Sequence, residues 1–387
     1  MPKNSLTSST TDSPAPLTRF SDLRQAEWNG LARTTGPFAD WRFLASLEDA
    51  ACIGRTCGWE PCLPVIRDDG DGRLRAAAPS FLKKNSHGEF VFDWAWAHAS
   101  QSAGMPWYPK LLVAAPFSPV PGPRLLGAES DREAALALVE QIEGLVHDRA
   151  LSSAGVNFCD EHDASVLREA GWLERFDWQF HWHNPGYRDF DDFLDCLKRK
   201  PRKNIRAERR RVREDGWRFE WKDGTEMGEA DLDLADRCYQ STFALYGNLP
   251  MLNRRFFELC AQRFGEQFLM CTASLDNEML AAAIYWRDDT RLYGRYWGSL
   301  VETKDVHFET CFYRGIDYCI RHGLQWFEPG AQGEHKIRRG FLPQKTHSFH
   351  FIRHAGMRRA IADWLQHEAR ALQEYRRYLD TLDPFAR

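Results

Sequence analysis

The chain has 387 residues, of which 43% are hydrophobic and 27% are charged, a composition that fits a folded globular protein and excludes a fibrous or intrinsically disordered one. Its length allows two domains of ordinary size. The formal net charge is −4, yet residues 198–213 hold ten Lys or Arg against one Glu, a local charge of +9. This asymmetry argues against a generally basic surface that coats nucleic acid and favours one local anion site.

The start of the chain and its cysteines predict a cytoplasmic protein. Residues 1–18 are rich in Ser, Thr and Pro and lack the apolar segment of a secretory signal, so we expect a disordered tail. The longest apolar run, 111–117, is too short to span a bilayer and contains a proline. The ten cysteines are scattered without CxxC spacing, which predicts reduced thiols and no metal site.

The first half of the chain predicts both strands and helices. Residues 59–79 are predicted to form a hairpin, because apolar stretches flank an Asp- and Gly-rich turn at 68–72. The stretch FVFDWAWA predicts a strand at 90–96, and residues 130–150 have the apolar spacing of an amphipathic helix. Further short strands are predicted at 155–158 and 178–182.

The second half has a clearer element order. Helices are predicted near 229–246, 253–264 and 307–322, and strands at 268–275, 279–286, 291–299, 324–328 and 347–352. An antiparallel meander, then a helix, then a further strand is the element order of GNAT-type acyltransferases. Residues 357–382 have the spacing of an amphipathic helix.

We therefore predict an α/β fold of two GNAT-like (acyl-CoA N-acyltransferase-like) domains with mixed, largely antiparallel sheets flanked by helices. The predicted organisation is a disordered tail at 1–18, an N-terminal GNAT-like domain at 19–190, a C-terminal GNAT-like domain at 191–354 that opens with a basic helix, and an amphipathic helix at 355–387.

The basic stretch RKPRKNIRAERRRVRE, residues 199–214, reads as one helix. Pro201 suits the first turn, where its missing N–H is no loss, and good helix formers follow until Gly216. Helical geometry places several arginines on one ridge beside a narrow apolar seam. Such a ridge is either a solvated surface or a phosphate-binding one, and the candidate donor-phosphate ligands are Arg202, Lys203, Arg206 and Arg209.

Two stretches resemble Fem-type aminoacyl transferases. LKRKPRKNIRAERRRVREDGWRFE is similar to the basic helix that opens their second domain, and FEPGAQGEHKIRRGF is similar to their late Gly-Gly loop and Phe-Lys-x-Gly-Phe hairpin. The hairpin departs from that pattern, since one extra residue separates Lys336 from Gly340 and His335 replaces the aromatic. The stretches NSHGEFVFDWAWA, LYGRYWG, HFETCFY and GAQGEHKIRRGFLP resemble the FemAB-like family, labelled peptidoglycan biosynthesis/recognition, over about residues 20–370.

This resemblance implies transfer of an aminoacyl or acyl group to an amine, hydroxyl or hydroxylamine acceptor, with a small molecule or a cell-wall precursor as acceptor. Aminoacyl-tRNA or acyl-CoA would be the co-substrate, and no tightly bound cofactor is expected. A conventional acetyl-CoA site needs a glycine-containing turn after the third meander strand, and SLVETKDVHFE, residues 299–309, contains no glycine. We therefore expect tRNA as the donor, with an acyl-CoA-dependent N-acetyltransferase or a non-catalytic recognition module for a cell-wall precursor or RNA as the alternatives.

The glycine-containing loop at 328–336 holds most candidate catalytic groups, because it follows a predicted central strand and offers ionisable side chains with flexible backbone N–H groups. The candidates are Glu328, Glu334, His335 and Lys336, with Gln332 as a substrate ligand and Arg339 as a ligand of a phosphate or an oxyanion. The alternative interpretation is a polar connection between strands.

Other candidates lie outside this loop. Asp93, on the predicted aromatic strand, is either a site carboxylate or a member of a buried salt bridge. Its possible neighbours are His87, Glu89, Tyr108 and Lys110. Arg295 and Trp297 share one face of a predicted strand as substrate-binding candidates, and Glu309 either binds substrate or complements a helix dipole.

Overall fold

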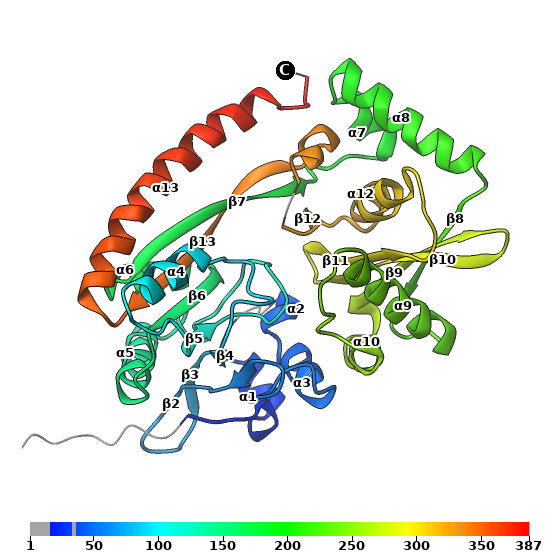
Figure 1. The fold of residues 1–387 in the computed structure, drawn as a ribbon. Helices are drawn as coiled ribbons and strands as arrows, with labels where there is room; N and C mark the ends of the chain where they lie inside the picture. The colour runs from blue at the N-terminus through cyan, green and yellow to red at the C-terminus, as the bar shows by residue number, and fades with distance from the viewer. Residues whose placement is uncertain (1–15, 33–35, 332, 387) are drawn as a thin grey trace, which may run out of the picture.

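The computed structural model describes residues 16–32, 36–331 and 333–386. One sheet of eleven strands runs through the molecule in the order β1-β4-β5-β6-β13-β7-β12-β11-β10-β9-β8 (Figure 1). The strands, in that order, are Trp59–Pro61, Ser80–Lys83, Lys110–Val113, Ser153–Cys159, Leu342–Ile352, Leu173–His183, Trp326–Glu328, Arg291–Ser299, Glu278–Arg287, Phe268–Leu275 and Arg218–Asp223. Within this sheet the pairs β5–β6 and β11–β12 are parallel and the other pairs are antiparallel.

The two halves of the chain share strands at the centre of this sheet. β13, late in the sequence, lies between β6 and β7 of the first half. β7 in turn pairs with β12 of the second half through Trp182 and His183. The predicted range 191–354 therefore contains a strand that completes the sheet of the preceding range.

The first half contributes the helices α1 (Gln25–Asn29), α2 (Gly36–Ala39), α3 (Trp41–Asp49), α4 (Trp94–Ser102), α5 (Arg132–Asp148) and α6 (Glu161–Glu169). The hairpin of β2 (Val65–Arg67) and β3 (Leu74–Ala77) and the helix α5 match the sequence predictions. Asp131 caps α5 by accepting a hydrogen bond from the backbone N–H of Ala134. The apolar face of α5 buries Leu138, Ile142 and Leu145.

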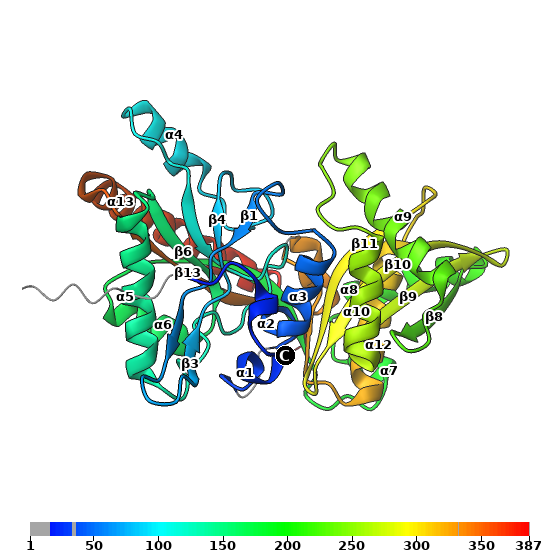
Figure 2. The same ribbon diagram turned by 90° about the horizontal axis from the view of Figure 1, so that it is seen from below.

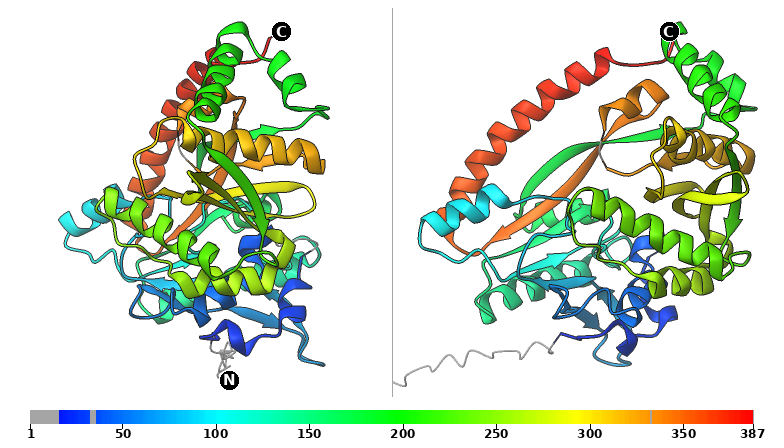
Figure 3. Two further views of the ribbon diagram at one scale, coloured as in Figure 1. Left: turned by 90° about the vertical axis from the view of Figure 1, so that its right-hand side faces the viewer. Right: turned by 45° about the vertical axis from the view of Figure 1, so that its right-hand side comes forward.

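The second half contributes α7 (Phe190–Asp195), α8 (Arg199–Glu214), α9 (Glu229–Leu245), α10 (Arg254–Phe264), α11 (Val306–Phe308), α12 (Arg314–His322) and α13 (Ala355–Thr381). A π-helical turn, Glu309–Tyr313, joins α11 to α12. Helices α9 and α10 cover one face of β9–β11, whereas α8 and α12 lie on the other (Figure 1). The long helix α13 packs on β7 and β13, and the chain end returns to the start of α8, where Leu197 bridges Phe385 (Figure 3).

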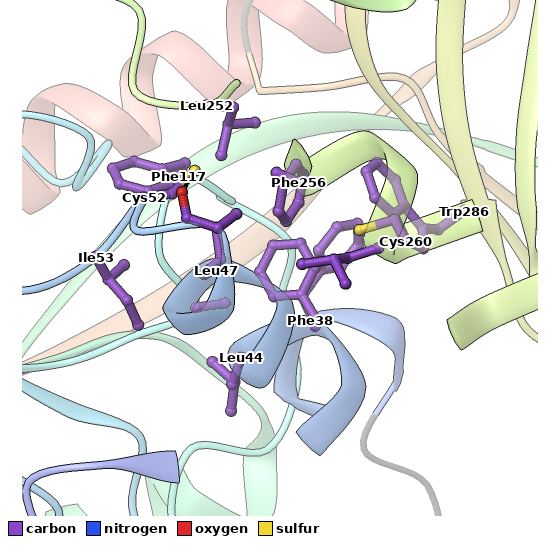
Figure 4. Packing of buried hydrophobic residues seen from close by; sticks show 14 of the residues in the cluster. Phe38, Leu44, Leu47, Cys52, Ile53, Phe117, Leu252, Phe256, Cys260 and Trp286 are labelled. Atoms are coloured by element: carbon purple, nitrogen blue, oxygen red, sulfur yellow. Dashed lines mark hydrogen bonds between the residues drawn. The ribbon is translucent and has the colours of Figure 1, made fainter. Parts of the chain in front are cut away.

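A continuous apolar core joins the two halves. Phe43 on α3 meets Phe256 on α10 edge to face, with 5.7 Å between ring centroids. Phe38 packs on Trp286 of β10 in the same cluster (Figure 4). Aromatic side chains from both halves therefore stabilise one shared core.

The predicted strand at 90–96 is wrong. Residues 90–93 are irregular and α4 begins at Trp94 and stands away from the body of the molecule (Figure 2). Phe90 has a φ of +61°, which breaks an extended strand. Asp93 is buried and bonds to Lys110 at 2.6 Å, so the alternation of polar and apolar residues that suggested a strand does not describe the environment of this carboxylate.

No helix in the described part of the chain is long and apolar enough to cross a membrane.

Candidate functional site

The parallel strands β11 and β12 pair over only three residues each and then separate. Arg291, Leu292 and Tyr293 pair with Trp326, Phe327 and Glu328. On the other side of β11, Ile284 faces Tyr296 and Tyr285 faces Gly294, so Arg295 is an extra residue in a β-bulge. The bulge at Arg295 comes directly after Tyr293, where β11 stops pairing with β12, and the two irregularities together open the sheet at one place.

A cavity of about 200 Å³ occupies this opening. It is lined by Ala283, Ile284, Tyr285, Gly294, Arg295, Tyr296, Trp297, His307, Cys311, Phe312, Pro329, His335 and Lys336. Two of these residues come from the π-helical turn, a rare irregularity that often marks functional sites.

Lys336 brings a buried amine to the cavity. A short 3-10 helix, Glu334–Arg339, carries the residue, and only 4% of its surface is exposed. Its Nζ donates to the carbonyl oxygen of Gly330 at 2.7 Å. Burial, together with the nearby charge of Arg295, lowers the pKa of Lys336 to about 7. The side chain therefore exchanges a proton readily at neutral pH.

Arg295 brings a second buried cation. Its Nη2 donates to the carbonyl oxygen of Phe117 at 3.0 Å, and its Nε has no hydrogen-bond partner among the described residues. The guanidinium also lies over the ring of Phe38, 5.7 Å from the centroid. Phe117 and Phe38 belong to the first half of the chain, so that half helps to position a charge in a cavity of the second half.

Glu328 ends β12 next to the cavity-lining Pro329. Its Oε1 accepts a hydrogen bond from Arg291 at 3.0 Å, whereas its Oε2 has no hydrogen-bond partner in the described part of the chain. Burial raises the pKa of Glu328 to about 7, against the opposing charge of Arg291. His181 lies 4.0 Å from Oε2, and burial lowers the pKa of this imidazole to about 3, so it stays neutral. Glu328 is therefore a proton acceptor tuned to neutral pH.

Two imidazoles form part of the cavity wall. Burial lowers the pKa of His307 to about 4, and it also lowers the pKa of His335. The ring of His307 packs against Trp297 at 5.4 Å between centroids, and that of His335 against Phe312 at 5.8 Å. Both imidazole rings are therefore neutral at pH 7 and add uncharged surface to the wall of the cavity.

The equivalent parallel pair in the first half is filled by the chain itself. Beyond Val156, where β5 and β6 stop pairing, Gly122 forms a parallel bridge with Cys159. Arg124 is buried there and donates to the carbonyl oxygens of Asn157 at 3.0 Å and Val120 at 2.6 Å. A second cavity of about 370 Å³ lies beside this segment, lined by Gly122 and Arg124 and by Asp288–Arg291 of the second half, but Arg124 fills the space directly between β5 and β6 with its own hydrogen bonds.

A family model described as peptidoglycan biosynthesis/recognition, FemAB_like, matches residues 19–387. The chain belongs to the FemAB-like family. No curated protein gives a significant sequence match.

Solved structures resemble this FemAB-like protein over most of its length. FemX is 12% identical with a TM-score of 0.54, covering 88% of this chain and 98% of that one. The C-terminal domain of a putative lysylphosphatidylglycerol synthetase from Agrobacterium fabrum is 10% identical with a TM-score of 0.53, covering 89% and 95%. L-PGS from Bacillus licheniformis is 10% identical with a TM-score of 0.50, covering 81% and 91%. At these identities the likeness concerns the fold alone, and the predicted α/β fold with a mixed, largely antiparallel sheet flanked by helices is confirmed.

Helix α8 of the FemAB-like protein has the predicted bounds, but acidic side chains from other elements meet its arginines. Arg202 bonds to Asp195 at 2.9 Å, and Arg206 lies 3.6 Å from the same carboxylate. Arg209 bonds through two nitrogens to buried Glu309, each at 3.1 Å, and Glu309 also pairs with Arg314. Arg209 and Glu309, both predicted ligands, therefore hold α8 against the π-helical turn, while Lys203 and Arg206 remain exposed.

The predicted loop residues divide into two groups. His335 and Lys336 line the cavity together with Arg295 and Trp297. Arg339 instead is buried, bonds to both carboxylate oxygens of Glu208 at 3.0 Å and donates to the hydroxyl of Tyr313 at 2.9 Å. Glu334 accepts a hydrogen bond from Tyr375 of α13 at 2.6 Å. Gln332 lies outside the described residues.

Asp93 and its predicted neighbours form a separate cluster in the first half. Lys110 donates to Asp93 at 2.6 Å and to Glu89 at 2.7 Å, and Ser86 links Asp93 to Tyr108. Burial raises the pKa of Glu89 to about 6. His87 is exposed and offers the cluster only its carbonyl oxygen, which accepts from Lys83. None of these residues lines the cavity beside β11. Asp93 is a member of a buried salt bridge, which is one of the two alternatives that the sequence allowed.

Sequence reasoning missed several cavity residues. Cys311 and Phe312 belong to the stretch HFETCFY, residues 307–313, in which only Glu309 is predicted as a site candidate. No local pattern connects them to Lys336, because the contact depends on the pairing of distant strands. Within the described residues, no group of three or more His, Cys, Asp or Glu is arranged to hold a metal ion.

Proposed function

We propose that this FemAB-like protein is an acyltransferase that moves an aminoacyl or acyl group from an activated donor to an amine, hydroxyl or hydroxylamine acceptor. The observation that carries the proposal is the cavity between β11 and β12, where buried Lys336 and Arg295 have no carboxylate bonded to them. Cations held in a water-poor cavity stabilise negative charge on a carbonyl oxygen far better than they do in water.

The proposed reaction is direct attack on the donor carbonyl. The lone pair of the acceptor nitrogen or oxygen forms a bond to the carbonyl carbon, and the carbonyl oxygen becomes an oxyanion beside the Lys336 ammonium. Glu328 takes the proton that the acceptor loses. The oxyanion then collapses, the bond from carbon to the donor oxygen or sulfur breaks, and the leaving group takes up the proton held by Glu328. No covalent acyl-enzyme is needed.

We propose aminoacyl-tRNA as the donor. Residues 299–309 lack the glycine of a pyrophosphate-binding turn, and the basic helix α8 leaves Lys203 and Arg206 exposed to contact phosphates. Arg209 and Arg339 are not assigned to donor phosphates, because their guanidinium groups are bonded to Glu309 and Glu208. The family description supports a cell-wall precursor as the acceptor.

A donor panel tests the proposal. The purified protein is incubated with labelled aminoacyl-tRNAs and labelled acyl-CoAs, and loss of the label from each donor is followed with and without an amine acceptor. We expect deacylation of at least one aminoacyl-tRNA. Lys336→Met is expected to abolish it, whereas Lys84→Met, at an exposed lysine, should leave it unchanged. Turnover of acyl-CoA alone would overturn the donor assignment, and tight donor binding without any turnover would overturn the enzymatic role.

A further inference from the structure

The ionisable side chains that line the cavity are all basic, apart from Cys311 and two tyrosines. The basic residues are Arg295, Lys336, His307 and His335. The two histidines are neutral at pH 7, so Arg295 and Lys336 supply the positive charge, and no Asp or Glu is among the lining residues. From this we infer that the transferred acyl group itself carries a carboxylate, as an acidic aminoacyl group or one half of a dicarboxylic acid does. The inference rests on the proposed function and names the substrate class of the same site.

The two buried cations are bonded to carbonyl groups in place of carboxylates. Arg295 donates to the carbonyl oxygen of Phe117, and Lys336 donates to that of Gly330. A buried charge whose hydrogen bonds go only to neutral carbonyl groups is costly, and an anionic ligand bonded to it relieves this cost. The unpartnered Nε of Arg295 is a further donor available to such a ligand.

The carboxylates around the cavity are already engaged by other side chains. Glu328 accepts from Arg291 at 3.0 Å, and Glu309 pairs with Arg209 and Arg314 at 3.1 and 3.0 Å. Glu208 is bonded to Arg339 and Glu334 to Tyr375. Each of these acids therefore has a hydrogen-bond partner outside the cavity. Glu328 keeps its Oε2 free of hydrogen bonds among the described residues and interacts with Arg295 only through its charge, so no described carboxylate is bonded to Arg295 or Lys336.

The size of the cavity selects between possible anions. At about 200 Å³ it is smaller than the 300–1,000 Å³ typical of sites for drug-sized ligands, so its volume suits a short acyl chain better than a nucleoside with its phosphate. An acyl chain the size of an amino-acid side chain does fit. Tyr285, Trp297 and Phe312 supply apolar wall for its methylene groups. The anion that reaches Arg295 is therefore a carboxylate at the end of the acyl chain.

Matched ester probes test the anion site without requiring turnover. Monomethyl glutarate and methyl glutaramate each carry one ester, and they differ only by a terminal carboxylate or carboxamide. By calorimetry we expect the carboxylate to bind about 10- to 100-fold more tightly, the ratio that charge-assisted hydrogen bonds provide. Equal binding of the two probes would overturn the inference. So would inorganic phosphate displacing monomethyl glutarate at equal concentration, since the cavity would then be a phosphate site.

Variants connect the discrimination to the named cation. Arg295→Met is expected to remove the preference for the carboxylate, and Arg295→Lys should keep part of it if the methionine variant does not fold. The matched control is Arg287→Met on β10, which removes a partly buried arginine bonded to Tyr318, outside the cavity. A control variant that also lost the preference would contradict the assignment to Arg295.

Donor pairs separate this inference from the proposed function. Glutamyl- and glutaminyl-tRNA, aspartyl- and asparaginyl-tRNA, and succinyl- and butyryl-CoA are compared for transfer to one amine. Preference for the acidic member by about 10-fold or more is expected. Equal transfer from neutral donors would overturn the inference and leave the transferase standing. Discrimination in probe binding with no transfer from any donor would overturn the proposed function and leave the anion site standing.

Discussion

Lys336 and Glu328 are two buried ionisable groups whose pKa values move toward each other. Burial lowers the pKa of the lysine to about 7 and raises the pKa of the glutamic acid to about 7. A carboxyl group and an amine that titrate at the same pH suit a reaction in which one group takes a proton while the other stabilises negative charge. These two residues therefore define how activity and stability should depend on pH.

A plot of kcat/KM for transfer against pH should be a narrow bell-shaped curve centred near pH 7. The reaction needs Glu328 as a carboxylate, the form present above its pKa. It also needs Lys336 as an ammonium group, the form present below its pKa. We expect Glu328→Gln to remove the acid limb of the profile of kcat/KM and to lower the maximum about 100-fold or more. Lys336→Arg should shift the alkaline limb upward. A flat profile from pH 5 to 9 for the unsubstituted protein would contradict these roles.

The free energy of unfolding should change with pH in two windows. Glu328 has a folded pKa above its unfolded value near 4.5, so its contribution to stability is lost as pH rises through about 4.5 to 7. Lys336 has a folded pKa below its unfolded value of 10.5, so the unfolded chain binds the extra proton and stability rises between about pH 7 and 10.5.

Denaturant unfolding of two variants measures these windows separately. Glu328→Gln should reduce the slope below pH 7, and Lys336→Met should reduce the slope above it. The remaining slopes come in part from Glu89 and Lys83, because burial raises the pKa of Glu89 to about 6 and lowers the pKa of Lys83 to about 7. At pH 7 and below, Lys336→Met should also raise the free energy of unfolding by roughly 1–3 kcal/mol, because it removes a buried amine without a counter-charge. A less stable Lys336→Met variant would mean that the ammonium is compensated in the folded protein.

At the scale of elements, the sequence predicts what depends on local pattern and fails where distant groups decide. Helix α8 begins and ends at the predicted residues 199 and 214, because helix formers with a suitable first-turn proline act locally. The strand expected at 90–96 is absent, and Asp93 instead forms an ion pair with Lys110 in the interior. The sequence predicts only part of the cavity. The polar residues of its loop indicate His335 and Lys336, whereas the contribution of Cys311 and Phe312 depends on how β11 and β12 separate.

The contact between α9 and β11 depends on a missing side chain. A Cβ on Gly298 would lie 1.8 Å from the carbonyl oxygen of Cys238, so α9 sits directly on the strand that carries Arg295. Gly298→Ala should cost more than about 3 kcal/mol of folding free energy. Gly144→Ala is the control, since a Cβ there meets nothing within 4 Å and alanine favours the helix by about 0.5–1 kcal/mol. Thermal unfolding of both variants checks the sign of each effect.

At the scale of the whole molecule, strand pairing, a shared apolar core and side-chain hydrogen bonds hold the two halves together. β13 completes the sheet of the first half, and β7 pairs onward with β12 of the second. The cluster around Phe43 and Phe256 continues the core from α3 to α10. The bond from Arg295 to the carbonyl of Phe117 links the cavity to the same interface. Loss of order in one half should therefore reach the cavity in the other.

A single substitution in the shared core should consequently destabilise both halves together. Phe43 is fully buried and touches Phe256 and Trp286 across the interface. Phe43→Ala should lower the free energy of unfolding by about 3–5 kcal/mol. Hydrogen exchange followed by mass spectrometry should show α5 of the first half and α12 of the second losing protection by the same amount, because both exchange through global unfolding. Phe92→Ala, at a ring that is 39% exposed, is the control and should change neither. Loss of protection confined to α5 would mean that the halves unfold independently despite their common sheet.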